Sequence, residues 1–386
     1  MSRFSLVLLL ALSPVPAFGI DADKLTKIDG AVTAAVGRNE CPGAVVVVVH
    51  GDAVVFRKAY GHRALVPENV PMTLDTVFDM ASLTKPIATG TSVMMLVEQG
   101  KLKFSDTVAK HWPAFAANGK DTVTIEHLLL HTSGLTADNA ASDYHDGRAK
   151  ARERIAALKL EAPAGTRFRY SDVGFIVLGD LVEKLGGTPV DAFAKKHVFA
   201  PLKMADTTFN PPAELKKRVA PTGKRKGEII LGAVHDPRAF SLDGVAGHAG
   251  LFSTADDVAR YCRMLMRGGE LDGVRVLSAD TVRLFTAPHP VPAGMTKDGK
   301  LDERKLARSL GWDVDTSFSS PRGDGFKKGE GYGHTGFTGT SVWIDPPSKT
   351  AVIILANRVH PDDKGNMTPL RKEVATIVAE ALRVAK

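Results

Sequence analysis

Cysteine is scarce in this chain of 386 residues, which contains only two, Cys41 and Cys262. Two cysteines can form at most one disulfide, so a scaffold held together by several disulfides is excluded. One bridge and two buried thiols both remain open, because both cysteines have apolar neighbours and disulfide geometry cannot be inferred from sequence alone.

Long apolar runs are also missing, since no segment offers the roughly 20 consecutive apolar residues that a membrane-spanning helix needs. The run at residues 4–12 is much shorter than that. It follows Arg3 and precedes the tripeptide A-F-G at 17–19, where small residues occupy the two positions that a signal peptidase checks. This pattern is typical of a secretory signal peptide over residues 1–19. We therefore expect an exported protein, periplasmic or secreted, with no membrane span.

Basic clusters with interleaved aromatic residues, the usual footprint of a nucleic-acid surface, are absent as well. The chain has 50 Lys and Arg against 43 Asp and Glu, a formal net charge of +7, but the basic residues are scattered. The denser groups at 216–218 and 224–226 have no aromatic residue between them. We therefore expect no nucleic-acid partner. With 44% hydrophobic and 24% charged residues, the composition is that of a globular protein.

Apolar runs with strand character occur at both ends of the chain. Residues 44–50 form a Val-rich run, a Gly-Asp pair signals a turn, and residues 53–60 have the pattern of the return strand of a hairpin. Near the other end, residues 339–344 and 350–356 are two apolar runs joined by D-P-P-S-K. Between these ends the apolar spacing is mainly helical. Helices are expected over residues 22–38, 82–100, 124–130, 171–185, 254–266 and 367–385.

This distribution predicts an α+β protein. One antiparallel sheet is built from both chain ends and flanked by helices, and a mainly helical domain is inserted between them. We place the α/β domain at residues 20–80 and 300–386, and the helical domain at residues 81–299. A small-molecule site is expected in the cleft between the two parts.

The segment S-L-T-K at residues 82–85 is the first with catalytic potential. It begins a predicted helix, so Ser82 and Lys85 lie one turn apart on the same face. A serine hydroxyl becomes a good nucleophile when a base takes its proton, and a lysine serves as that base when burial lowers its pKa. The helix N-terminus also suits a developing oxyanion. Taken alone, the same residues also fit a helix cap followed by a surface lysine.

Two further segments carry polar groups suited to the same chemistry. Tyr170 precedes a predicted helix together with Asp172, and a phenol near a lysine can act as general acid and base. His334, Thr335 and Gly336 enter a strand-like run, where a glycine lets a substrate backbone come close. Alone, the first segment also fits a half-buried tyrosine with a helix cap, and the second a glycine-rich loop.

Together the three segments resemble the serine β-lactamase and penicillin-binding protein superfamily, in its class C β-lactamase, DD-peptidase and esterase branch. The pattern of that family is S-x-x-K, then Y-x-N, then K-T-G or H-T-G, and this chain has the three elements in that order. Further segments match, including T-I-E-H-L-L-L-H-T-S-G-L at 124–135, G-T-R-F-R-Y-S at 165–171, A-P-L-K-M at 200–204 and L-F-S-T-A-D-D at 251–257. The resemblance covers nearly the whole predicted mature chain.

The resemblance implies a β-lactamase/transpeptidase-like fold and a role for each matched residue. Ser82 would be the acylated nucleophile, and Lys85 and Tyr170 would share the base work. The backbone N–H groups of Ser82 and Phe337 would form the oxyanion hole. The substrate would contact the following residues: Asp172, His248, His334, Thr335 and Gly336. No cofactor or metal is implied.

Two positions depart from the family pattern. Asp172 stands where many members have Asn, and an ionised aspartate donates no hydrogen bond. It can instead pair with Lys85 and keep that lysine charged, which would shift the role of general base toward Tyr170. His334 stands where β-lactamases usually have Lys, and a neutral histidine holds a carboxylate less strongly than an ammonium does. Both departures favour a DD-peptidase or an esterase over efficient β-lactam turnover.

Three hypotheses for the function follow. The first is a serine hydrolase that acts by acylation and deacylation of Ser82 on D-Ala-D-Ala peptides or related amides and esters, with a carboxylesterase or weak β-lactamase as the variant. The second is a penicillin-binding or wall-binding sensor that is acylated without turnover. The third is a metal-dependent hydrolase using His127 and His131, four residues apart on a predicted helix. No G-x-S-x-G motif is present, which excludes the usual α/β-hydrolase esterase.

Overall fold

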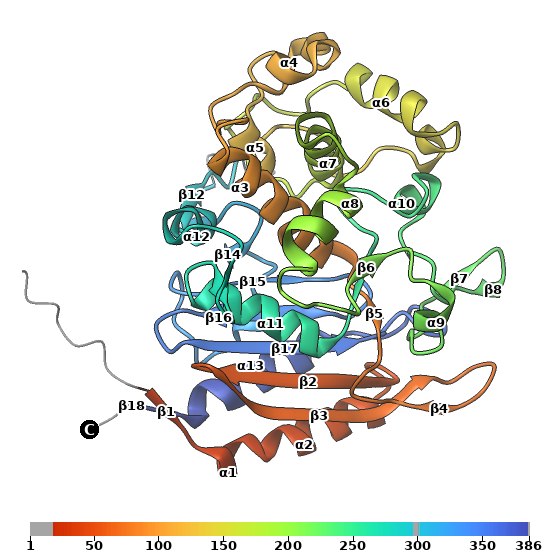
Figure 1. The fold of residues 1–386 in the computed structure, drawn as a ribbon, viewed down its shortest axis with the longest axis vertical. Helices are drawn as coiled ribbons and strands as arrows, with labels where there is room; N and C mark the ends of the chain where they lie inside the picture. Colours follow the sequence, from red (N-terminus) through yellow and green to blue (C-terminus); the bar gives the residue numbers. More distant parts are fainter. Residues whose placement is uncertain (1–17, 296–299, 301, 385–386) are drawn as a thin grey trace, which may run out of the picture.

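The computed structural model describes residues 18–295, 300 and 302–384. The predicted signal peptide therefore lies outside the described residues, apart from its last two positions. Within the described ranges, no helix is both long enough and apolar enough to cross a membrane. Figure 1 shows the molecule as two parts, with a sheet and its covering helices at one end and a mainly helical part at the other.

A nine-stranded antiparallel sheet brings the two chain ends together. The two ends meet where β2 near the N-terminus pairs with β17 near the C-terminus, in register at Val47 and Ile353. The α+β architecture predicted from the sequence, with one sheet built from both ends, is confirmed. In spatial order the strands are β12 (His289–Val291), β13 (Leu306–Arg308), β14 (Asp313–Asp315), β15 (Tyr332–Thr335), β16 (Ser341–Asp345), β17 (Thr350–Ala356), β2 (Gly43–His50), β3 (Ala53–Ala64) and β4 (Val70–Pro71).

Strand β2 shows why the sheet forms from a continuous apolar run. Successive side chains of a strand point to opposite faces. Val45 and Val47 join the core on the side of the helical part, whereas Val46 and Val48 join a second core under the outer helices. Both faces are therefore covered, and strands buried on both faces lose the polar alternation of exposed ones. The outer helices are α1 (Ala22–Leu25), α2 (Lys27–Gly37) and α13 (Thr368–Ala381).

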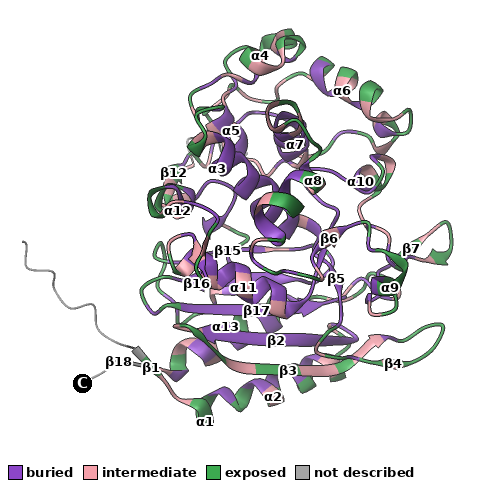
Figure 2. Ribbon diagram, in the orientation of Figure 1, coloured by how far each residue is buried: buried purple, intermediate pink, exposed green. Residues whose placement is uncertain are grey.

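The helical part packs on the other face of the sheet, with the buried interior visible in Figure 2. Its helices are α3 (Thr91–Glu98), α4 (Val108–His111), α5 (Ile125–Leu129), α6 (Arg148–Ala157), α7 (Asp172–Gly186), α8 (Val190–Ala194), α9 (Ala213–Lys216), α10 (Pro237–Ser241), α11 (Ala255–Met266) and α12 (Ala279–Thr286). Short strands complete the fold: β1 (Phe18–Ile20), β5 (Phe78–Asp79), β6 (Thr208–Phe209), β7 (Lys224–Arg225), β8 (Glu228–Ile229), β9 (Leu251–Ser253), β10 (Glu270–Leu271), β11 (Val274–Arg275) and β18 (Leu382–Val384).

Helix α7 is the central helix of this part, and its ends follow from local chemistry. The Ser171 hydroxyl accepts a hydrogen bond from the Gly174 N–H at 3.2 Å, a typical N-cap. Gly187 ends the helix in the left-handed conformation, with φ of 79°. The predicted helix over 171–185 is thus confirmed to within one residue at each end. Its N-terminus places Tyr170 and Asp172 at the boundary between the two parts.

The predicted continuous α-helix over residues 82–100 is wrong in its first half. The chain forms a 3₁₀ turn at Ala81–Leu83, then a π-helix at Lys85–Gly90, and becomes α-helical only in α3. The Thr91 hydroxyl donates to the Pro86 carbonyl at 3.0 Å, so this carbonyl of the π-helix has a side-chain donor. Such π segments are rare and often lie at functional sites.

Both cysteines are buried free thiols, so the question left open by the sequence is answered against a disulfide. Cys41 belongs to the core under α2 and α13, and Cys262 to the core of the helical part. Burial raises the pKa of Cys41 to about 12, since a thiolate is poorly solvated there. These thiols therefore act as small apolar side chains.

Candidate active site

A cavity of about 510 Å³ lies where the start of α7, the Ser82 turn and the end of β15 meet. It is lined by residues from segments that are far apart in the sequence, which is the usual arrangement for a small-molecule site. Of the residues predicted to form the site, the following line it: Ser82, Tyr170, Asp172, His248, His334, Thr335 and Phe337. Lys85 lies buried directly behind Ser82.

Ser82 lies in the 3₁₀ turn, directly after a residue with unusual backbone geometry. Ala81 has φ of 46°, a left-handed conformation that is uncommon for alanine. Its N–H donates to the buried Asp79 carboxylate at 2.8 Å, which helps to hold the turn. Burial raises the pKa of Asp79 to about 6 despite this bond. A strained residue held by its surroundings is a common feature of functional sites.

Lys85 is fully buried and connects Ser82 to the helical part. Its Nζ donates to Ser82 Oγ at 3.0 Å and to the His248 carbonyl at 3.1 Å, and it forms an ion pair with Asp172 Oδ1 at 2.6 Å. Burial lowers the pKa of Lys85, but the charges and hydrogen bonds of Asp172 and Tyr170 outweigh burial and raise that pKa to about 12. Lys85 is therefore an ammonium near neutral pH.

Tyr170 lies over Lys85, with its ring centroid 4.9 Å from Nζ, and its ring stacks on His131 at 4.4 Å. Burial raises the pKa of the Tyr170 phenol, while the ammonium of Lys85 opposes that rise. Its side chain also interacts with Ser82 and Lys85. A neutral phenol between a serine and an ammonium is suited to pass a proton in either direction.

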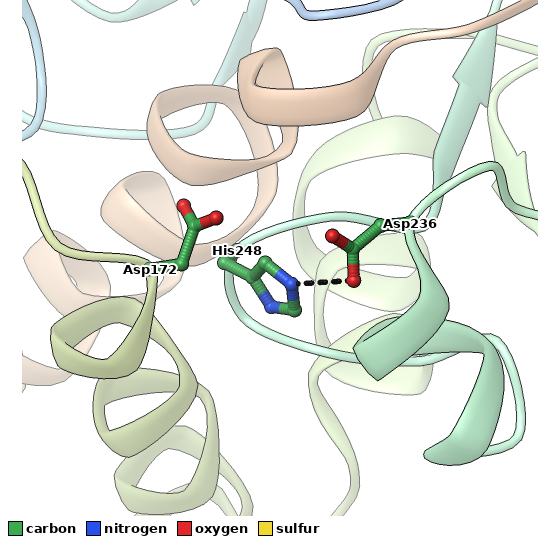
Figure 3. A group of neighbouring side chains, drawn as sticks. All are labelled: Asp172, Asp236 and His248. Carbon is green, nitrogen blue, oxygen red and sulfur yellow. Dashed lines mark hydrogen bonds and ion pairs between the residues drawn. The ribbon is translucent and has the colours of Figure 1, made fainter. Parts of the chain in front are cut away.

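Asp172, Asp236 and His248 form a polar group on the same wall (Figure 3). His248 Nε2 donates to Asp236 Oδ1 at 2.9 Å. One donor atom from each of the three lies within 4.8 Å of the others, as a metal site would require. Asp172, however, is already paired with the Lys85 ammonium, which would repel a bound cation. The three side chains fit an ion-pair network around Lys85 better than a metal centre.

The opposite wall is formed by the end of β15 and the turn after it. His334 donates from Nδ1 to the Thr335 carbonyl at 2.8 Å, and Thr335 lines the cavity. Burial, with smaller contributions from Arg308 and Lys85, holds the pKa of His334 well below its usual range, so its imidazole is neutral. A side chain at Gly336 would collide with the Met80 carbonyl, 2.6 Å from its ideal Cβ, so the turn can approach the segment before Ser82 this closely only with glycine at this position.

Arg308 in β13 is a cavity residue that the sequence interpretation missed. It is fully buried, and its Nη1 donates to Asp313 Oδ1 at 3.0 Å. Its Nε and Nη2 have no hydrogen-bond partner among the described residues. The signal that could have pointed to it is a single charged residue in the mainly apolar stretch L-A-R-S-L-G-W at 306–312.

The pairing of His127 and His131 on one helix is wrong. Helix α5 ends at Leu129, and His131 follows it in the left-handed conformation, with φ of 56°. His127 Nδ1 accepts from the Thr124 N–H in a capping box, and His131 Nδ1 accepts from the Ser171 N–H at 3.0 Å. Each imidazole thus fixes backbone at a different place, and His131 supports the ring of Tyr170.

Comparison with known proteins agrees with this geometry. The family model described as Beta-lactamase matches residues 28–376. An N-acetylmuramyl-L-alanine amidase of Bacillus subtilis (strain 168) is 33% identical over 372 residues, covering 87% of this chain and 81% of the relative. A putative D-alanyl-D-alanine carboxypeptidase of Escherichia coli O157:H7 is 31% identical over 378 residues, covering 89% and 84%.

Solved structures show the same fold. The crystal structure of a penicillin-binding protein homologue from Caulobacter crescentus superposes with a TM-score of 0.73 at 22% identity, covering 94% of this chain and 98% of that one. The architecture is therefore the β-lactamase/transpeptidase-like fold predicted from the sequence. Together with the match over residues 28–376, these findings show that the chain belongs to the Beta-lactamase family, a family of serine hydrolases.

Proposed function

We propose that the chain is an exported DD-carboxypeptidase-like enzyme that cleaves peptides ending in D-Ala-D-Ala through an acyl-enzyme on Ser82. The observation that carries the proposal is the contact of Ser82 Oγ with the buried Lys85 ammonium, beneath Tyr170, in a cavity that also holds the buried cation Arg308. The relatives named as a carboxypeptidase and as an amidase support the same class of amide substrate. Export rests on the predicted signal peptide.

In the acylation step, Ser82 Oγ attacks the carbonyl carbon of the scissile amide. The serine proton passes to the Tyr170 oxygen while Tyr170 gives its own proton to the leaving nitrogen, so the carbon–nitrogen bond breaks and D-alanine leaves as an amine. The N–H groups of Ser82 and Phe337 bind the oxyanion. Lys85 stays charged and stabilises negative charge on the Tyr170 oxygen during the transfer.

In the deacylation step, water attacks the ester carbon and the oxyanion forms in the same place. The water proton passes through Tyr170 to Ser82 Oγ, which restores the serine hydroxyl and releases the peptide acid. Asp172 keeps Lys85 charged through both steps. No co-reactant other than water is needed.

Arg308 gives the reason for choosing a peptide acid over a neutral ester. His334 is neutral, so it supplies no charge to hold a carboxylate. Arg308 lines the same cavity and has two guanidinium nitrogens without partners among the described residues. Buried guanidinium donors are costly unless an acceptor meets them, and a carboxylate is the acceptor that fits them best. We assign the terminal carboxylate of the substrate to Arg308, with Thr335 beside it.

The test compares an N-acylated peptide ending in D-Ala-D-Ala with its C-terminal amide, in the wild type, Arg308→Gln and Arg308→Lys. We expect the wild type to prefer the free acid, and Arg308→Gln to lower kcat/KM for the acid by about 10- to 100-fold, as loss of a charged hydrogen bond predicts. Arg308→Lys should retain part of the preference. Hydrolysis of a neutral nitrophenyl ester should change little, which serves as the control for intact folding.

Other outcomes would redirect the assignment. If the acid and the amide are cleaved equally and Arg308→Gln changes neither, the carboxylate role of Arg308 is wrong. If neither peptide is cleaved but the ester is hydrolysed in a Ser82-dependent way, the enzyme is a carboxylesterase. The sensor hypothesis has its own support, since an ammonium held by Asp172 is a poor base. A labelled penicillin adduct that persists for hours in intact-mass spectra, without peptide turnover, would favour that hypothesis.

A further inference from the structure

The turn after β15 is held by a side chain from the outer layer of the protein. Helix α13 packs with α2 on the sheet face away from the helical part (Figure 1). Its Arg371, only 8% exposed, donates from Nη2 to the Gly336 carbonyl at 3.1 Å and to the Thr340 carbonyl at 2.9 Å. A buried arginine thus contacts both ends of the turn that carries Phe337.

The hydrogen bond from Arg371 to the Gly336 carbonyl involves the peptide group that also carries the Phe337 N–H. The Gly336 carbonyl and the Phe337 N–H belong to the same planar amide. A cation that binds the carbonyl oxygen draws electron density from the amide, which makes its N–H a stronger donor, and it also fixes the direction of that N–H. In the proposed function this N–H is one of the two oxyanion donors.

The other side of the turn is fastened to the nucleophile segment. The Thr338 hydroxyl donates to the Asp79 carbonyl at 2.7 Å, and the Thr340 hydroxyl donates to the Met80 carbonyl at 3.1 Å. Both acceptors lie within three residues of Ser82. The amides of Phe337 and Ser82 are therefore held relative to one another by bonds on the cavity side, and Arg371 acts on the turn from the opposite side.

We propose that Arg371 is a positioning residue that orients and polarises the Gly336–Phe337 amide and so sets the strength of the oxyanion hole. The proposal rests on the proposed function, because it needs Phe337 N–H to bind the oxyanion. Arg371 does not line the cavity and does not touch the substrate; its effect passes through one peptide group. It should therefore influence the tetrahedral state more than substrate binding.

A second buried cation provides a matched control for a purely structural role. Lys120 is fully buried and donates from Nζ to the carbonyls of Ala117, Ala156 at 2.9 Å, and Leu158, near α6 and away from the cavity. Like Arg371, it connects backbone carbonyls from separate segments. Its loss should lower stability without altering the oxyanion hole.

The experiment compares the wild type, Arg371→Met, Arg371→Lys and Lys120→Met in the mature protein. It measures Tm, kcat and KM for a nitrophenyl ester, and the affinity for phenylboronic acid, which forms a tetrahedral adduct with an active serine. We expect Arg371→Met to lower kcat by about 10- to 100-fold, less than the complete loss of an oxyanion donor, with KM within about threefold. The boronate affinity should fall by a similar factor. Arg371→Lys should recover part of the kcat and part of the boronate affinity. Lys120→Met should lower Tm and keep kcat within about twofold of the wild type.

Three results decide between the possibilities. If kcat and boronate affinity change no more in the Arg371 variants than in Lys120→Met, the positioning role is wrong, while the hydrolase function stands. If the wild type shows neither ester hydrolysis nor boronate binding, the proposed function itself fails. If Arg371→Met does not fold, the decision rests on Arg371→Lys, which keeps a cation at the turn. A loss of boronate affinity in Arg371→Lys without a loss of Tm supports the positioning role, and unchanged boronate affinity contradicts it.

Discussion

The two walls of the cavity differ in charge. The wall built from the helical part carries charged groups in contact with partners, among them Lys85, Asp172 and Asp236. The wall built from β15 carries the neutral imidazole of His334 and the backbone of the turn that ends at Thr340, and the buried Arg308–Asp313 pair lies beyond it on β13 and β14. The contrast matches the chemistry assigned to each wall, because proton transfer needs groups that titrate, whereas oxyanion binding needs fixed dipoles whose charge does not change during the reaction.

The difference also follows from how each wall is built. Tyr170 and Asp172 flank an N-cap, where side chains are free to meet groups from other segments, and Lys85 reaches them from the π-helix. Strand β15 instead uses its backbone in the sheet, pairing with β16 from Tyr332 to Thr335. The turn at the end of a strand offers backbone amides of fixed direction, and the start of a helix offers side chains. The fold thus places each kind of group where its secondary structure supplies it.

The largest effect is expected from removing Ser82, the proposed nucleophile. Ser82→Ala should lower kcat for the ester by at least about 10³-fold, as loss of a catalytic serine does in comparable enzymes, and should abolish the penicillin adduct. Ser241→Ala, which removes another helical serine outside the cavity lining, should leave both unchanged. The measurement is intact mass over time together with steady-state kinetics. An adduct that persists in Ser82→Ala would place the nucleophile elsewhere.

A smaller effect is expected from neutralising the carboxylate that keeps Lys85 charged. Asp172 raises the pKa of Lys85, so Asp172→Asn must lower that pKa. Because the proposed relay needs a charged Lys85 beside Tyr170, the alkaline limb of kcat against pH should move to lower pH, and the loss of kcat should grow as the pH rises toward that limb.

The direction in which the pH profile moves separates two mechanisms. If Asp172→Asn instead raises activity near neutral pH and moves the acid limb to lower pH, then neutral Lys85 is the base and Tyr170 is not the relay. Asp138→Asn is a suitable control, because Asp138 also lines the cavity but forms its ion pair with Arg238 rather than with Lys85. Its profile should keep the alkaline limb of the wild type.

The general architecture could be predicted from the sequence because it depends on local patterns. The hairpin over 44–60 is present as β2 and β3, paired from Gly43 to His50, and the two late apolar runs are β16 and β17. Period-2 and period-3.6 spacing, turn pairs and helix caps all act within a few residues. The grouping of Ser82, Lys85 and Tyr170 depends on the family resemblance, since no local pattern joins Tyr170 to a serine so far away in the sequence.

What the sequence could not supply depends on contacts between distant segments. The π-helix after Ser82 is set partly by side-chain bonds to carbonyls, including Thr89 Oγ1 to the Gly247 carbonyl at 2.7 Å. The apolar stretch around Arg308 marks it as unusual, but its place beside the cavity is known only once the bulge in β13 and its pairing with Asp313 are known. The sequence allows Asp172 to keep Lys85 charged, but only the 2.6 Å contact between them establishes the ion pair. Electrostatic tuning is a property of the assembled site.

The smallest effect is expected from replacing His334 on the β15 wall. This replacement tests whether the His334 imidazole is neutral during the reaction. Since the pKa of His334 lies well below its usual range, the imidazole should act only through neutral hydrogen bonds. His334→Asn keeps a neutral polar group, so kcat/KM for the peptide acid should stay within about threefold, the size expected for one neutral hydrogen bond. The pH dependence between about pH 5.5 and 8 should also match that of the wild type, because His334 stays neutral over that range. A wild-type inflection near pH 6.5 that disappears in His334→Asn, but not in His127→Asn outside the cavity, would mean that His334 carries a proton in the reaction. The separation of proton transfer from oxyanion binding between the two walls would then be wrong, and His334 would belong with Tyr170 among the acid–base groups.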